Sequence, residues 1–252
     1  MLSVFEYWFI RYRRTWRGSV VISVANPLLF LVGIGAGLGH LVDRHAPAQI
    51  AGVQYAAFFA PGLLAAAAMQ TAFLEGSGPV ARAATSGAYN DATPTPLAPG
   101  DLMGGHLLYI AFRLATSSAA FVVVMTAFGL TDGWNALAVL AAALLTGMAF
   151  AAPAAAWAVG VRQQRHVNTM YRMVVMPLYM FSGTFFALSQ LPAGIRPLVN
   201  ALPLAQGVEL CRTLSLGTAT VAGTAVHVGY LLALTVAGIA VARTTYRRRL
   251  HG

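Results

Sequence analysis

Long apolar runs separated by short polar segments dominate the pattern along this chain of 252 residues. Charged side chains are absent from six windows: residues 18–42, 46–74, 114–131, 133–161, 173–195 and 213–242. Each window is long enough for a helix to cross the roughly 30 Å hydrocarbon core of a bilayer. A helix satisfies its own backbone hydrogen bonds in lipid, and no strand-like alternation competes with it. The pattern therefore predicts an all-α membrane protein with a single transmembrane domain over residues 1–252.

Within this domain we predict six transmembrane helices, at residues 18–42, 53–75, 104–131, 134–161, 170–188 and 217–242. Aromatic side chains recur at helical spacing before the first span, with arginines between them: Phe5, Trp8, Phe9, Tyr12 and Trp16. This spacing predicts an amphipathic helix over residues 1–17 that lies in the membrane interface. A simple aromatic and basic anchor for the first span is the alternative.

Composition agrees with a membrane protein, since 58% of the residues are hydrophobic and only 9% are charged. The sixteen basic residues are all arginines. The predicted topology places three of them, Arg44, Arg196 and Arg212, on one side of the membrane and the other thirteen on the opposite side. The positive-inside rule then predicts cytoplasmic termini and a cytoplasmic segment 82–101. Because arginines at span ends sit beside anionic headgroups, the net charge of +9 does not call for a nucleic-acid partner.

Several chemistries are excluded by missing residues. Without lysine the chain cannot form a phosphate-binding loop of the G-x-x-x-x-G-K-[ST] type or a lysine Schiff base. The run GIGAGLG at residues 33–39 lacks dinucleotide-loop spacing, and we interpret it as a surface for close helix packing. The six histidines are scattered and Cys211 is the only cysteine, so we expect neither a metal site nor catalytic residues.

The acidic residues also bear on the energy source of transport. Ion-coupled carriers place a carboxylate in mid-membrane as a relay, whereas here all seven acidic residues, Glu75 included, are assigned to span ends or loops. Transport powered by another subunit is therefore favoured. Arg113, about two turns into the third span, is the one charge in an apolar stretch. We expect it to snorkel to the surface, with a role as a charge in the substrate pathway as the alternative.

A permease without an ATPase site must receive force from a partner, and the polar stretch RAATSGAYNDATPTPLAPGD at residues 82–101 is the candidate docking element. Residues 82–91 can form a short coupling helix that the following prolines stop and stiffen. An ordinary solvated loop is the alternative. The candidate ATPase-coupling residues are Arg82, Gly87, Tyr89, Asn90, Asp91, Pro94, Pro96 and Pro99.

The segment 189–212 contains Pro192, Pro197 and Pro203, which divide it into pieces too short to span. We expect short re-entrant helices that dip into the outer leaflet. Nearby apolar side chains would give an adaptable substrate pathway and outer gate, with core packing as an equal alternative. These residues are Met176, Met180, Phe181, Phe185 and Phe186.

Two stretches resemble a known family, the integral-membrane permease subunits of type-2 ABC exporters. ATPTPLAPGDLMGGHLL at residues 92–108 is similar to the family's Thr-Pro-Leu-x-Pro loop exit. MPLYMFSGTFFALSQLPAGIRPLVNALPLAQGVELCR at residues 176–212 is more specific, because FSGTFF is followed by a Leu-Pro-Leu step and Arg212. Ala187 departs from the family, in which proline is common there. The resemblance covers nearly the whole chain and is to the nodulation-factor J and daunorubicin-resistance B branches.

This resemblance implies a bacterial half-transporter in the plasma membrane. Two permeases, expected as a homodimer, would pair with two copies of a cytoplasmic ABC ATPase that binds ATP and Mg²⁺, so this chain itself holds no cofactor. The first branch implies outward movement of a lipid-linked saccharide or glycolipid, and the second implies drug efflux. A membrane enzyme acting on lipids and a non-transporting membrane scaffold remain as alternatives from other classes.

Overall fold

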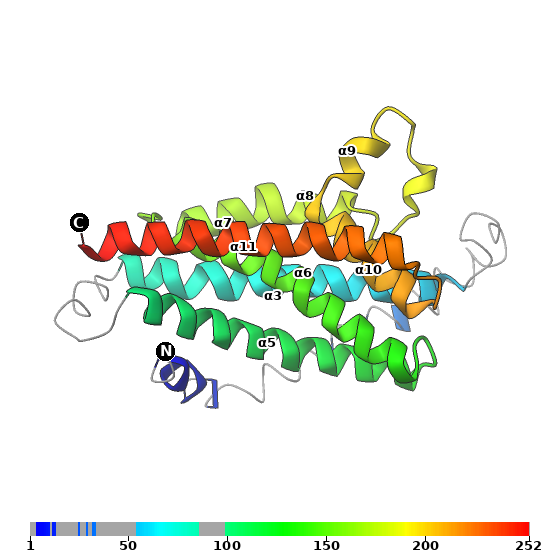
Figure 1. The fold of residues 1–252 in the computed structure, drawn as a ribbon, viewed down its shortest axis with the longest axis horizontal. Coiled ribbons are helices and arrows are strands. Elements are labelled where there is room, and N and C mark those ends of the chain that lie inside the picture. The colour runs from blue at the N-terminus through cyan, green and yellow to red at the C-terminus, as the bar shows by residue number, and fades with distance from the viewer. Residues whose placement is uncertain are drawn as a thin grey trace.

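The computed structural model describes residues 4–10, 12, 13, 25, 29, 32, 33, 54–85 and 99–251 (Figure 1). These residues contain no strand, which confirms the predicted all-α class. The principal helices are α3 (Tyr55–Thr85), α5 (Pro99–Ala127), α6 (Gly133–Ala158), α7 (Arg165–Met170), α8 (Met176–Phe181), α9 (Arg196–Asn200), α10 (Pro203–Ser215) and α11 (Val221–His251). A π-helical turn, Tyr171–Val175, joins α7 to α8, and a 3₁₀ turn lies at Leu188–Gln190.

Four of these helices are long and apolar enough to cross a membrane: Tyr55–Ala83, Gly100–Ala127, Gly133–Ala158 and Val221–Arg248. They lie where the second, third, fourth and sixth spans were expected. The expected first span, residues 18–42, lies almost entirely outside the described residues. The fifth was expected at 170–188, and there the helical segment runs instead from Arg165 to Phe181 through the π-helical turn.

Helix α6 lies at the centre of the bundle and packs against α3, α5, α10 and α11. Its buried face consists mostly of alanine, together with Val139, Thr146 and Gly147. Side chains this small let neighbouring backbones approach closely, which is how helices associate where lipid supplies no hydrophobic driving force.

Glycines mark the closest of these approaches. At four positions an added methyl group would collide with another helix: Gly76 in α3 with Ala151, Gly147 in α6 with Leu114, Gly207 in α10 with Thr146, and Gly238 in α11 with Pro153. The run at residues 33–39, expected to supply such packing, is described only at Gly33, where a methyl group would meet nothing within 4 Å. The observed contacts instead come from isolated glycines, which no local sequence pattern marks.

The described residues of the N-terminal segment are helical from 4 to 10 and pack against α5. The Phe9 ring lies 5.5 Å and the Tyr12 ring 5.6 Å from the ring of Phe112, and the Trp8 ring stacks on Tyr109 at 5.8 Å. Tyr7 is exposed on the opposite side. In the described residues the aromatic spacing thus produces a helix with one packed and one open face. Its position in the membrane interface stays a prediction.

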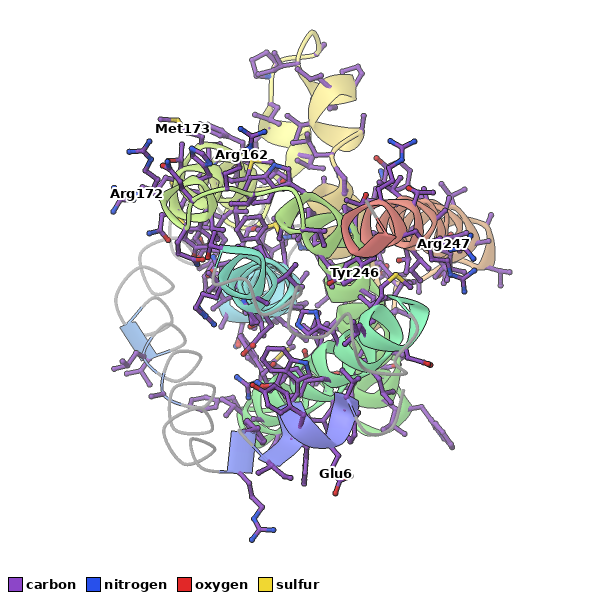
Figure 2. All side chains as sticks on the ribbon, turned by 90° about the vertical axis from the view of Figure 1, so that its left-hand side faces the viewer. Glu6, Arg162, Arg172, Met173, Tyr246 and Arg247 are labelled. Carbon is purple, nitrogen blue, oxygen red and sulfur yellow. The ribbon has the colours of Figure 1, made fainter. Side chains whose placement is uncertain are left out.

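The two ends of the bundle differ in charge. The end of α3, the start of α5, the turn between α6 and α7 and the end of α11 lie together, whereas α9 and α10 lie at the far end (Figure 1). Figure 2 looks at the first end and labels Arg162, Arg172 and Arg247 there. All three side chains are exposed. Arginines from separate segments therefore gather at one end, which we call the arginine-rich end.

The contact at Gly238 leads to a stability prediction. A methyl group there would lie 2.5 Å from the Pro153 Cδ and 2.9 Å from the Pro153 backbone nitrogen, which cannot move aside. We expect Gly238→Ala to lower the free energy of unfolding by about 1–3 kcal/mol, as overpacking does. Gly229→Ala in the same helix is the control, because a methyl group there meets nothing within 4 Å. Thermal unfolding of the purified variants in detergent measures both. Equal melting temperatures would contradict the tight α6–α11 contact.

Candidate functional site

Two centres of charge lie inside the helix bundle, and both involve α3. Arg212 hydrogen bonds to Phe58 near the start of α3, and Arg113 pairs with Glu75 further along the same helix. At 1.5 Å per residue these positions are about 25 Å apart along the helix axis. The candidate site therefore has two parts, one toward each end of the bundle.

The first centre is the ion pair between Arg113 in α5 and Glu75 in α3. The Arg113 Nε lies 3.2 Å from the Glu75 Oε1, and the two side chains are 11% and 24% exposed. The Arg113 guanidinium carbon also lies 4.7 Å from the centroid of the Tyr12 ring. The expectation that Arg113 snorkels to the surface is therefore wrong, because a carboxylate and an aromatic ring hold it inside.

Glu75 was expected at the end of a span, but helix α3 continues beyond it to Thr85, and the carboxylate lies inside the candidate span Tyr55–Ala83. A charge is tolerated there because its partner compensates it, whereas an unpaired buried charge is very costly. To carry protons or ions across the membrane, the Glu75 carboxylate would first have to break its ion pair with Arg113. The argument against ion-coupled transport therefore now depends on this ion pair.

The second centre is Arg212 in α10, which is almost fully buried. Its Nε donates a hydrogen bond to the Phe58 carbonyl oxygen at 3.2 Å, and its Nη2 donates to the Gly183 carbonyl oxygen at 2.8 Å. Its Nη1 lies 3.3 Å from the Glu209 Oε2, and its guanidinium carbon lies 3.8 Å from the centroid of the Phe58 ring. One side chain thus joins α3, α10 and the turn after α8. Sequence reasoning had placed Arg212 at the end of the re-entrant segment 189–212, and the family motif was the only signal that pointed to a particular role for it.

The turn that Arg212 binds follows α8 and ends that helix at Phe181. Gly183 has a φ of +77°, in the left-handed region that glycine adopts readily. Ser182 and Thr184 on either side are fully buried, and a methyl group on Gly62 of α3 would lie 3.1 Å from the Thr184 carbonyl oxygen. The helix therefore stops before residue 188 because Gly183 turns the chain back onto α3.

The predicted outer-gate residues do not come together on one surface. The Phe185 ring packs 5.4 Å from Phe59 and 5.1 Å from Tyr179, and the Tyr55 hydroxyl donates to its carbonyl oxygen at 3.1 Å. Met180 and Phe181 instead point outward from α8, while Met176 and Phe186 are half-buried. A gate at these residues stays a prediction.

The predicted coupling segment is described only at its two edges. Residues 82–85 are the last turn of α3 and do not begin a separate helix, and Arg82 is exposed there. Pro99 begins α5. The other coupling residues, Gly87, Tyr89, Asn90, Asp91, Pro94 and Pro96, lie outside the described residues.

The proline-rich segment 189–212 forms short pieces, as its sequence predicted, with Pro197 and Pro203 in the first turns of α9 and α10. Beside them a cavity of about 630 Å³ lies between the turn Leu188–Gln190, α10 and α11. Within the described ranges, no three histidine, cysteine or acidic side chains come together as a metal site would require. The site therefore offers hydrogen bonding, paired charge and apolar surface.

Comparison with known proteins relates this chain to one family of membrane transporters. The family model described as "ABC-2 type transporter" matches residues 2–216. Nodulation protein J of Rhizobium meliloti (strain 1021) is 28% identical over 250 residues, which cover 99% of this chain and 93% of the relative. The proteins of the same name from Rhizobium leguminosarum bv. trifolii and Sinorhizobium fredii are each 30% identical, again over 99% of this chain and 93% of theirs.

The ion pair Arg113–Glu75 leads to a prediction about paired substitutions. Arg113→Leu leaves the Glu75 carboxylate buried without its partner, and we expect a loss of about 3–5 kcal/mol in the free energy of unfolding. The double variant Glu75→Leu/Arg113→Leu should recover most of that loss, because no buried charge remains. Thermal unfolding measures both, with Arg172→Leu at an exposed position as the control. Additive losses in the double variant would show that the two charges are not coupled.

A second prediction concerns Arg212 and uses the neighbouring thiol as a reporter. Cys211 is fully buried, and this burial raises its pKa to about 12 despite the opposing effect of the Arg212 guanidinium. The native thiol should therefore not react with maleimide at neutral pH.

Arg212→Lys should expose this thiol, because an ammonium group cannot reach the Phe58 and Gly183 carbonyl oxygens together as the guanidinium does. We expect rapid maleimide labelling of Cys211 and a loss of about 2 kcal/mol or more in the free energy of unfolding. Arg196→Lys, in the same proline-rich segment, is the control. If Cys211 stays protected in Arg212→Lys, the arginine does not hold this end of the bundle together.

Proposed function

Because this chain belongs to the ABC-2 type transporter family, as a membrane permease subunit, we propose that it moves a lipid-linked saccharide, a glycolipid or a similar amphipathic molecule outward across the bacterial plasma membrane. A separate ATPase would power the movement. The similarity over 99% of the chain to relatives named Nodulation protein J carries the proposal. It favours the glycolipid branch of the resemblance over the drug-efflux branch.

Membership of the family implies an ABC ATPase partner. We propose that two such subunits bind ATP and Mg²⁺ and dock on two copies of this chain. The exposed arginines support a cytoplasmic position for the arginine-rich end, since basic residues concentrate on the cytoplasmic side. Helix α3 ends and α5 begins at this end (Figure 1), and the segment that joins them in the sequence is the docking element that we propose.

A site-specific crosslinking experiment tests the docking element. A photoreactive residue at position 89, replacing Tyr89, should capture the co-expressed ATPase in cells. The same residue at position 134 is the control, because Trp134 is 86% exposed at the start of α6, at the opposite end of the bundle. Capture at 134 but not at 89 would reverse the proposed orientation.

Replacement of the aromatic side chain then measures its contribution to binding. We expect Tyr89→Ala to lose the ATPase during purification, because an aromatic interface residue often contributes about 2 kcal/mol or more. Trp134→Ala should retain it. ATP-driven transport of a glycolipid into inside-out vesicles should fall in parallel with ATPase retention. A wild-type complex that retains the ATPase but moves no glycolipid would argue against the proposed substrate class.

A further inference from the structure

The cavity beside α10 and α11 has a mixed lining. Apolar side chains form part of its wall: Phe58 in α3, Ala187 and Leu188 at the 3₁₀ turn, Ala205 in α10, Leu216 just after α10, and Val226 in α11. Polar side chains form the rest: Ser189, Asn200, Gln206, Glu209, Arg212, Thr213, Thr218 and His227. The volume of about 630 Å³ falls within the range of about 300–1,000 Å³ for small-molecule sites.

Hydrogen bonds within the protein hold the planar polar groups of this lining in place. The Gln206 Nε2 donates to the Asn200 carbonyl oxygen at 2.5 Å, and the Gln206 Oε1 lies 2.5 Å from the His227 Nδ1. The amide of α10 is thus fixed between the end of α9 and α11. Groups oriented in this way bind a ligand with little further loss of side-chain freedom.

The charges of the lining balance each other. Glu209 and Arg212 form an ion pair at 3.3 Å, and the Glu209 side chain is still 40% exposed. An anionic ligand would be repelled by the partly exposed Glu209 carboxylate, and a cationic ligand would have to compete with Arg212, which already pairs with that carboxylate. A neutral ligand avoids both conflicts, provided that it can donate hydrogen bonds to the carboxylate.

A hydroxyl group both donates and accepts hydrogen bonds, so it suits a wall that carries carboxylate, amide and imidazole groups. Apolar side chains on the same wall can cover the C–H surfaces of a sugar ring. Val226 lines the cavity and is also 66% exposed, and Val236, further along α11, is 64% exposed. The cavity therefore borders exposed apolar side chains of α11 that can hold an alkyl chain.

We propose that this cavity binds the uncharged glycosyl headgroup of an amphipathic molecule, with its alkyl chain along α11. The proposal rests on the proposed function in one respect, since the exported glycolipid is the molecule that would supply such a headgroup. It adds a location, at the end of the bundle opposite the arginine-rich end. Gln206 and Glu209 are the residues that we assign to headgroup binding.

A binding experiment without the ATPase tests this site. The permease in nanodiscs is exposed to a decyl maltoside whose photoreactive group is at the first chain carbon, next to the sugar, and the labelled peptides are identified by mass spectrometry. Decyl phosphocholine with the photoreactive group at the same chain carbon is the matched probe, because it shares the tail but carries a charged headgroup. We expect the maltoside to label peptides that line the cavity and the phosphocholine to label only lipid-facing positions. Equal labelling of the cavity by both probes would overturn the proposal.

Substitutions locate the contacts. Gln206→Ala removes one hydrogen-bonding amide, and Glu209→Gln replaces a charged acceptor with a weaker neutral one, so each should reduce maltoside labelling of the cavity about fivefold or more. Gln190→Ala is the control, since Gln190 is exposed on the neighbouring turn and does not line the cavity. Protection of Cys211 from maleimide verifies that each variant is folded. Unchanged labelling in folded Gln206→Ala and Glu209→Gln would overturn the assignment.

The two proposals fail in different ways. Capture of the ATPase at position 89 without maltoside labelling of the cavity would support the proposed exporter and contradict the proposed headgroup site. Specific maltoside labelling of the cavity without ATPase capture would support a glycoside-binding membrane protein and contradict the proposed ATP-driven export. The binding experiment requires no transport, so its result does not depend on turnover.

Discussion

The close approach of four helices to α6 is the constraint on which the rest of the structure depends. Where α3, α5, α10 and α11 come closest to α6, a glycine removes the side chain that would hold the two backbones apart. In a membrane this proximity is itself stabilising, because packing and not water exclusion drives helix association. The close packing on α6 sets the distances between the helices, and those distances bring together the side chains of both charged centres.

Both charged centres bind helices that the close packing has already brought together. Arg212 reaches Phe58 because α10 and α3 both lie against α6, and Glu75 reaches Arg113 because α3 and α5 are neighbours. A buried charge must be paired and hydrogen-bonded, so each centre adds a requirement that only one arrangement of these helices meets. Helix α3 is held at both centres and leads from the Arg212 region to the proposed ATPase-docking segment.

This arrangement connects the two proposed activities. The docking segment follows α3 at the arginine-rich end, and Phe58 near the start of α3 lines the cavity at the other end. Arg212 contacts Phe58 and lines the same cavity, and its ion-pair partner Glu209 is an assigned headgroup ligand. A displacement of α3 by the ATPase would therefore act directly on the residues of the proposed glycosyl site.

The sequence alone determined the helical class, the positions of four long apolar helices and the short pieces of the segment 189–212. Hydropathy and proline act locally, so a one-dimensional pattern is sufficient to identify their effects. The coupling segment, also inferred from a local pattern, remains a prediction. Tertiary structure decided where the charges are paired. The local pattern put Glu75 at the end of a span and Arg212 at the end of the re-entrant segment, because it contains neither the partner Arg113, 38 residues from Glu75, nor the partner Phe58, 154 residues from Arg212. The pairing that makes burial of such charges possible is set by helix packing, which hydropathy along the chain does not encode.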